Sequence, residues 1–158
     1  ETWVTHDGQL VDDPEVIRRA DFTRKTNYYW FAMMFKLTDP GVDHEYLGTR
    51  TVDGMEYDVV RMTFGENVGD AQDTYVLYIN PWTHLVDQFL YTVMDFGVTE
   101  PSLKRLTYRN VDGLMLPVRR ISTQSNWEGE VLGDGWSEQI MEDIELENGF
   151  DREMFEQP

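Results

Sequence analysis

The chain has 158 residues, 41% of them hydrophobic and 13% aromatic, which is enough apolar material for a globular domain with its own core. Thirty acidic residues against thirteen basic ones give a formal net charge of −17, and such a negative field excludes nucleic acid as an expected partner. The sequence has no cysteine, which excludes disulfides, thiolate metal sites and a cysteine nucleophile.

The first segment, Trp3 to Gly8, is typical of a short strand that runs into a turn, because Gly8 accepts the positive φ that such a turn needs. A domain rarely opens on a strand. We therefore expect residues 1–158 to be a single domain that lacks the N-terminal strands of the full protein.

A helix is predicted from Pro14 to Leu37. Asp13 suits the cap, proline suits the first turn, and Asp39-Pro40-Gly41 suits the end. An alternative is a break near Ala20-Asp21. The segment from Tyr28 to Phe35 is apolar on nearly all sides, so we expect it to be covered on most of them.

From Glu45 onwards, alternation with a period of two predicts a series of strands. They are Leu47–Val52, Met55–Phe64, Thr74–Ile79, Leu85–Phe96, Leu103–Arg109, Leu114–Trp127 and Trp136–Glu147. Asp53-Gly54 and Asp112-Gly113 are hairpin turn signals, as is the proline-initiated turn from Asn80 to His84. The expected fold class is mainly β, with an open antiparallel sheet curled into a half-barrel.

Two details of this pattern yield further expectations. Arg119 and Arg120 lie in the middle of a predicted strand, where alternation buries one of them, so either a β-bulge or a buried ion pair is expected there. The tail from Phe150 to Phe155 is predicted to form a short helical turn pinned by its two phenylalanines.

Several segments resemble an uncharacterised family of bacterial envelope lipoproteins. They are Phe35-Lys36-Leu37-Thr38-Asp39-Pro40-Gly41-Val42, Asp53-Gly54-Met55-Glu56-Tyr57-Asp58-Val59-Val60, Asp73-Thr74-Tyr75-Val76-Leu77-Tyr78-Ile79-Asn80-Pro81 and Gly113-Leu114-Met115-Leu116-Pro117. The ending, from Phe150-Asp151 to Gln157-Pro158, is similar to that of LolA-like lipoprotein-carrier domains. This resemblance implies a curved sheet whose concave face is packed by an aromatic-rich helix, leaving an apolar cavity for acyl chains. It carries over no catalytic residues.

We expect the apolar cavity to be lined by aromatic and methionine side chains, which suit an adaptable pocket. The predicted lining residues are Tyr29, Trp30, Met33, Met34, Phe35, Met62, Phe64 and Phe89. The alternative is that the helix simply fills the sheet as core.

Metal binding has weak support. Glu66, Asn67, Asp70 and Asp73 share one loop, but their spacing fits no EF-hand pattern. His6, His44 and His84 are isolated from one another and are interpreted as residues of solvated turns. No cofactor is expected.

The sequence contains no Gly-x-Ser-x-Gly elbow, phosphate loop or dinucleotide fingerprint. The first hypothesis is therefore a non-catalytic protein, periplasmic or lipid-anchored through an upstream cysteine, that holds an acyl chain, a lipid or a lipidated partner. The second is an accessory subunit of a membrane-associated complex, which docks through sheet edges and exposed aromatics such as Trp82 and Trp136. The third is a hydrolase without a recognisable motif.

Overall fold

The structure is a computed structural model, and it describes residues 2–66, 68 and 72–156. These form β1 (Thr5–His6), β2 (Gln9–Leu10), α1 (Pro14–Lys36), β3 (Val42–Val52), β4 (Met55–Phe64), β5 (Tyr75–Ile79), β6 (Val86–Val93), η1 (Met94–Phe96), β7 (Val98–Val111), β8 (Leu114–Gln124), β9 (Ser137–Ile140) and η2 (Arg152–Phe155). The chain divides into two compact units, Glu1–Met33 with Asp143–Pro158, and Met34–Glu142.

The first unit contains the β1–β2 hairpin, most of α1 and the tail. The Oδ1 atom of Asp13 accepts hydrogen bonds from the amides of Glu15 and Val16, at 2.9 and 3.3 Å, which caps α1 as its sequence predicts. The alternative of a break near Asp21 is wrong, because α1 is continuous and Asp21 pairs with Lys25 one turn later at 2.8 Å. Hydrogen bonds from Lys25 and Thr2 hold the pKa of Asp21 well below its usual range.

The predicted helical turn in the tail is confirmed as η2, a 3-10 helix. The Oδ1 atom of Asp151 accepts hydrogen bonds from the amides of Glu153 and Met154. However, Phe150 and Phe155 are 59% and 67% exposed. The expectation that these two rings pin the turn is therefore wrong, and capping by Asp151 stabilises it instead.

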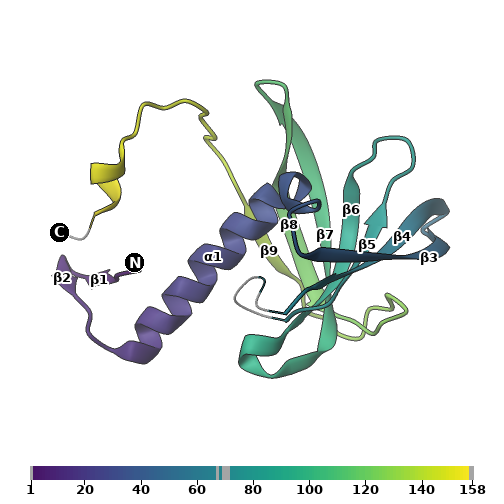
Figure 1. Cartoon of the computed structure of the whole chain (residues 1–158), viewed down its shortest axis with the longest axis horizontal. Helices are drawn as coiled ribbons and strands as arrows, with labels where there is room; N and C mark the ends of the chain where they lie inside the picture. Colours follow the sequence, from purple (N-terminus) through teal and green to yellow (C-terminus); the bar gives the residue numbers. More distant parts are fainter. Residues whose placement is uncertain (1, 67, 69–71, 157–158) are drawn as a thin grey trace. The chain divides into compact units, whose positions relative to one another are not determined.

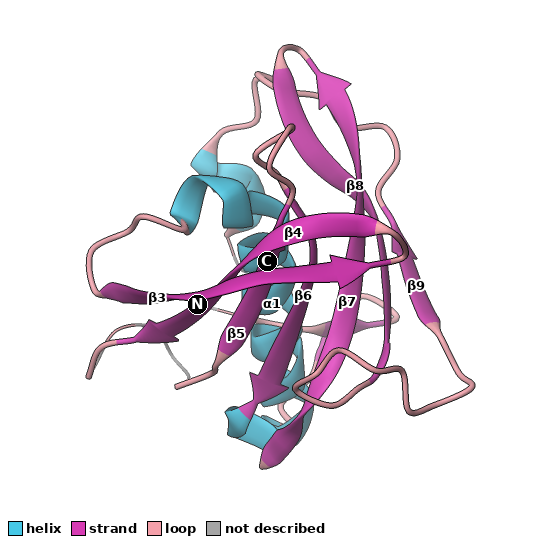
Figure 2. Ribbon diagram, turned by 90° about the vertical axis from the view of Figure 1, so that its right-hand side faces the viewer, coloured by secondary structure: helices cyan, strands magenta, loops and turns pink. Residues whose placement is uncertain are grey.

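The second unit is a seven-stranded antiparallel sheet in the order β3-β4-β5-β6-β7-β8-β9, so every strand pairs with its neighbours in sequence (Figure 1). Strand direction turns strongly along the sheet (Figure 2). The sequence thus predicted the mainly β class, the open antiparallel sheet and the single long helix correctly. The bounds of β4 are those predicted.

The hairpin turns are also confirmed. Asp53 and Gly54 have φ values of 51° and 83°, and Asp112 and Gly113 have 49° and 89°. Two successive positive φ values define the turn whose twist matches that of the flanking strands, which explains the Asp-Gly pair at both places.

The last strand is much shorter than predicted, because β9 covers only Ser137–Ile140. It ends opposite a bulge in β8, where the register to β7 shifts between Thr107 and Tyr108 and Val118 is the extra residue. The amide of Met141 still donates to the carbonyl of Val118, at 2.8 Å, and pairing then stops. A bulge disrupts the ladder and increases the local twist, which turns the edge of β8 away from a longer partner.

The sheet has two faces with different contents. The cluster face carries the buried core residues Val59, Val76, Tyr78, Leu90 and Leu103. The opposite, aromatic face carries Met62, Phe64, Tyr75, Phe89 and Tyr91, with the Tyr75 and Phe89 rings 5.7 Å apart. Phe89 and Leu90 are consecutive and both completely buried, so both faces are covered at β6.

Arg50 fastens β3 to the rest of the second unit. Its Nη1 atom donates to the hydroxyl of Tyr78 and to the carbonyl of Trp127, each at 3.0 Å. Tyr78 is completely buried, so its hydroxyl needs such a partner. These bonds join β3, β5 and the loop after β8 on the cluster face.

Candidate functional site

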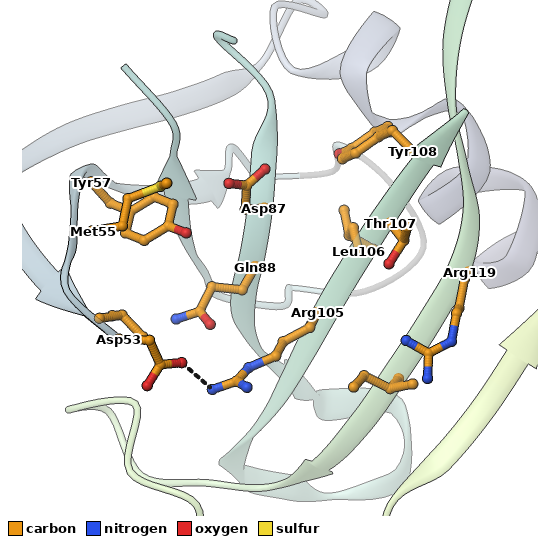
Figure 3. A pocket seen from close by; sticks show the side chains of 12 residues that line it. Asp53, Met55, Tyr57, Asp87, Gln88, Arg105, Leu106, Thr107, Tyr108 and Arg119 are labelled. Carbon is orange, nitrogen blue, oxygen red and sulfur yellow. Dashed lines mark ion pairs between the residues drawn. The ribbon is translucent and has the colours of Figure 1, made fainter. Parts of the chain in front are cut away.

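A cleft of about 570 Å³ opens on the cluster face of the second unit (Figure 3). We call it the arginine cleft. Its wall consists of Val52, Asp53, Met55, Tyr57, Asp87, Gln88, Arg105, Leu106, Thr107, Tyr108, Arg119 and Ile121. The turn between β3 and β4 provides one side and β7 with β8 the other, because the twist of the sheet brings these strands together.

Arg105 lies at the centre of the arginine cleft, at a position where β7 pairs with Gln88 of β6 and Ile121 of β8. Its Nη2 atom is 3.7 Å from Oδ2 of Asp53, and its guanidinium lies 5.6 Å from the ring centre of Trp136. Its Nε atom is buried and has no hydrogen-bond partner among the described residues. A buried donor of this kind is costly unless an acceptor, such as a ligand atom or water, reaches it.

A β-bulge in β6 places the carboxylate of Asp87 in the wall of the arginine cleft. Tyr78 pairs with Gln88 and Ile79 with Val86, so Asp87 is the extra residue. Its Oδ2 atom accepts a hydrogen bond from Nδ2 of Asn80 at 2.9 Å. Burial, and then the charge of Asp87, raise the pKa of Tyr57. Tyr57 therefore stays a neutral phenol in the cleft.

Two further groups bound the cleft. Nε of Arg119 donates to Oε1 of Glu138 at 2.5 Å, which ties β8 to β9 at a half-exposed position. The hydroxyl of Tyr108 donates to the carbonyl of Val86 at 2.8 Å. Burial raises the pKa of Tyr108 far above its usual value, so this bond persists at physiological pH.

The arginine cleft combines apolar and polar surface. Val52, Met55, Leu106 and Ile121 are apolar, whereas the other eight lining residues carry polar groups (Figure 3). Gln88 is 5% exposed and brings an amide to the base of the cleft. Such a wall offers apolar contact to a small organic molecule and several hydrogen-bonding groups to its polar end.

The eight residues predicted to line an apolar cavity lie elsewhere. Met62, Phe64 and Phe89 share the aromatic face of the sheet, as expected, and Tyr75 links the rings of Phe64 and Phe89 at 6.1 and 5.7 Å. Tyr29, Trp30, Met33, Met34 and Phe35 lie on α1. Met33 is buried, whereas Phe35 is 55% exposed. Their role as a cavity lining stays a prediction.

Sequence reasoning missed the arginine cleft. Its residues come from five strands and a turn, and no local motif contains them. One signal was present, because two adjacent strands each carry consecutive cations, Lys104-Arg105 and Arg119-Arg120. The expectation that alternation buries one of the latter pair is confirmed, since Arg120 is 3% exposed, and the expected bulge lies close by at Val118.

The candidate metal residues do not converge. Among the described residues, no group of three or more histidine or acidic side chains is arranged to hold a metal ion. Asn67 and Asp70 of the acidic loop lie outside the described residues, and Asp73 accepts hydrogen bonds from Thr92 and the amide of Met94. His6, His44 and His84 are exposed, but His6 lies in β1 and His44 in β3, so neither of these two lies in a turn, contrary to expectation.

The fold and cleft define a class, namely small antiparallel β-sheet proteins with a mixed polar and apolar cleft on one sheet face. Residues 16–107 match a family of unknown function, DUF6503, and the chain belongs to this family. Comparison with curated proteins and with solved structures gave no match. In the described part of the chain, no helix is both long enough and apolar enough to cross a membrane.

Proposed function

We propose that this chain is a non-catalytic binding protein that holds an apolar or amphiphilic ligand, such as an acyl chain or a lipid, against its sheet. The observation that carries this proposal is the arginine cleft, whose volume of about 570 Å³ suits a small organic ligand. The four apolar residues of its wall contribute apolar contact to binding. The buried Nε of Arg105 offers a donor to a polar end of the ligand.

The finer expectations belong to the same proposal. They are a LolA-like half-barrel with the aromatic-rich helix on its concave face, and a location in the periplasm or on a membrane through a lipid anchor. In this arrangement the segment from Tyr28 to Leu37 also lines an apolar cavity. Trp30→Ala or Met34→Glu tests that part: loss of lipid-probe binding at an unchanged melting temperature supports a lining role, whereas unfolding supports a core role.

Two methionines provide a matched test of the arginine cleft. Met55 and Met115 are both 37% exposed and both closely follow an Asp-Gly turn, but only Met55 lines the cleft. We expect Met55→Glu to weaken binding of a fluorescent fatty acid probe by about tenfold, because a carboxylate opposes burial of an acyl chain. Met115→Glu should leave binding unchanged. Equal effects of the two substitutions, or no probe binding by the wild type, contradict the proposal.

Native mass spectrometry of protein from the source organism separates this proposal from the second candidate, an accessory subunit of a membrane-associated complex. Trp82 is 70% exposed and Trp136 is 42% exposed, as expected for a docking surface. A co-purifying lipid supports the binding protein. A stoichiometric protein partner without lipid supports the accessory subunit.

A further inference from the structure

The aromatic face contains a second cleft, of about 560 Å³, with a different character. We call it the hydroxyl cleft. It is lined by Tyr91, Ser102, Ser122, Thr123, Gln124, Gly133, Asp134, Gly135 and Ser137. Four neighbouring strands contribute hydroxyls that share the aromatic face, with Tyr91 on β6, Ser102 on β7, Ser122 on β8 and Ser137 on β9. Their register places Tyr91 opposite Ser102, and Ser122 opposite Ser137.

These hydroxyls form a connected cluster with a cation behind it. The Oγ atoms of Ser122 and Ser137 are 2.8 Å apart, and Ser102 and Ser122 hydrogen-bond the phenol of Tyr91. Nζ of Lys104 donates to Oγ of Ser122 at 3.3 Å and lies 5.5 Å from the ring centre of Tyr91. An ammonium group only donates, so Ser122 uses an oxygen lone pair for Lys104 and keeps its own hydrogen for another acceptor.

The surroundings of Lys104 favour an anion. Lys104 is 2% exposed and Arg120, on the same face, is 3% exposed. Burial, and then the charge of Arg120, lower the pKa of Lys104 to about 8. The two cations therefore raise the potential at the hydroxyl cluster in a protein whose overall charge is strongly negative.

We propose that the hydroxyl cleft binds a phosphate group, with Ser122 and its neighbouring hydroxyls donating to the phosphate oxygens and Lys104 supplying positive charge from behind Ser122. Several hydroxyl donors around a compact ammonium charge suit a tetrahedral anion with many acceptor sites. The planar forks of Arg105 and Arg119, which fit carboxylate and phosphate alike, lie on the other face. This proposal is independent of ligand binding in the arginine cleft.

Titration of the isotope-labelled full chain with inorganic phosphate tests the proposal, with amide and lysine side-chain resonances as the readout and sodium chloride as the ionic-strength control. The chain has only three lysines, at positions 25, 36 and 104, so Lys104 can be assigned by substitution. We expect saturable shifts at Lys104 and at the amides of Ser102 and Ser122. No saturation at tens of millimolar phosphate, or equal shifts with chloride, overturns the proposal.

Three variants make the test specific. Ser122→Ala and Lys104→Met should each weaken phosphate binding about tenfold or more, because each removes a charge-assisted contact. Asp134→Asn should tighten binding about threefold at low salt, because it removes a like charge from the rim of the cleft. Thr99→Ala, at an exposed site on β7, is the control. If Ser122→Ala fails to fold, Ser137→Ala at its exposed partner takes its place.

A short-chain phosphatidic acid below its micelle concentration distinguishes the two sources of a phosphate group. Equal affinity for inorganic phosphate and for the lipid indicates a site for free or small-molecule phosphate. Tighter binding of the lipid indicates a lipid headgroup. Binding unchanged by Ser122→Ala and by Lys104→Met would show that phosphate is held elsewhere, and the proposal would then be wrong.

Discussion

Two consecutive cations on β7 have opposite environments. Lys104 is 2% exposed on the aromatic face, whereas the side chain of Arg105 is 38% exposed on the cluster face and approaches the carboxylate of Asp53. The same contrast occurs on β8, where Arg120 is buried and Arg119 pairs with an exposed glutamate. Alternation along a strand, not residue type, decides which of two neighbouring cations loses its water.

This difference between buried and exposed cations indicates which face of the sheet is the better candidate for a functional role. An exposed ion pair contributes little to stability and is easily replaced. A buried cation costs stability, and a costly group at a cleft is a candidate for a functional role. The aromatic face therefore carries buried charge beside a cleft, whereas the cluster face carries charge that solvent can screen.

The largest expected effect is on the free energy of unfolding, and it tests whether both faces of the seven-stranded sheet are packed. Phe89→Ala on the aromatic face should lower the free energy of unfolding by about 3–5 kcal/mol, and Leu90→Ala on the cluster face by about 2–5 kcal/mol, because both side chains are completely buried. Urea denaturation measures both. Arg109→Ala, at an exposed site on the same sheet, should change the free energy by less than about 0.5 kcal/mol. A cost below about 1 kcal/mol for either core variant would show that its face is open in solution.

The next effect is a pH dependence caused by Lys104. Its pKa is about 8 in the folded protein and 10.5 in the unfolded chain, so between these pH values the unfolded chain binds more protons. The stability of the wild type relative to Lys104→Met should therefore rise from pH 7 to pH 10.5, by on the order of 3 kcal/mol. Urea titrations at several pH values measure this rise. Arg109→Met should show no such trend, since a guanidinium stays charged; a flat difference for Lys104→Met would mean that its ammonium is solvated.

The smallest effect on stability is expected at Arg105, the more exposed of the two consecutive cations on β7. Arg105→Met should lower the free energy of unfolding by less than about 1 kcal/mol, because its contact with Asp53 is long and half-exposed. The effect should shrink further in high salt, which screens exposed charges. Urea titrations at low and high sodium chloride measure it. A loss above about 2 kcal/mol would place Arg105 in a buried pair and remove the contrast with Lys104.

Much of the fold was predictable because its signals are local. The bounds of β4 and both Asp-Gly turns follow from alternation and from the tolerance of Asp-Gly for positive φ. The length of β9 was not predictable, since Ile140, Ile144 and Leu146 continue the alternation beyond the point where pairing stops. Only the partner strand, bulged at Val118, decides where β9 ends.

The candidate sites were predictable only in part. Alternation predicts that one of Arg119 and Arg120 is buried, but the bulge at Val118 breaks the parity of Arg120 with Leu114 and Leu116, and the register opposite Leu106 places Arg120 on the aromatic face. The convergence of Asp53 with Arg105, and of Tyr91 with Ser122, depends on strand order and register, which no local pattern encodes.

The amino-acid sequence by itself determined the mainly β class, the antiparallel hairpins, the long helix and the acidic surface, because each depends on neighbours within a few residues or on composition alone. The tertiary structure decided which face each cation occupies and which hydroxyls surround Lys104. Twist and register bring residues far apart in the chain to one place, and the resulting loss of water changes the chemistry of those residues.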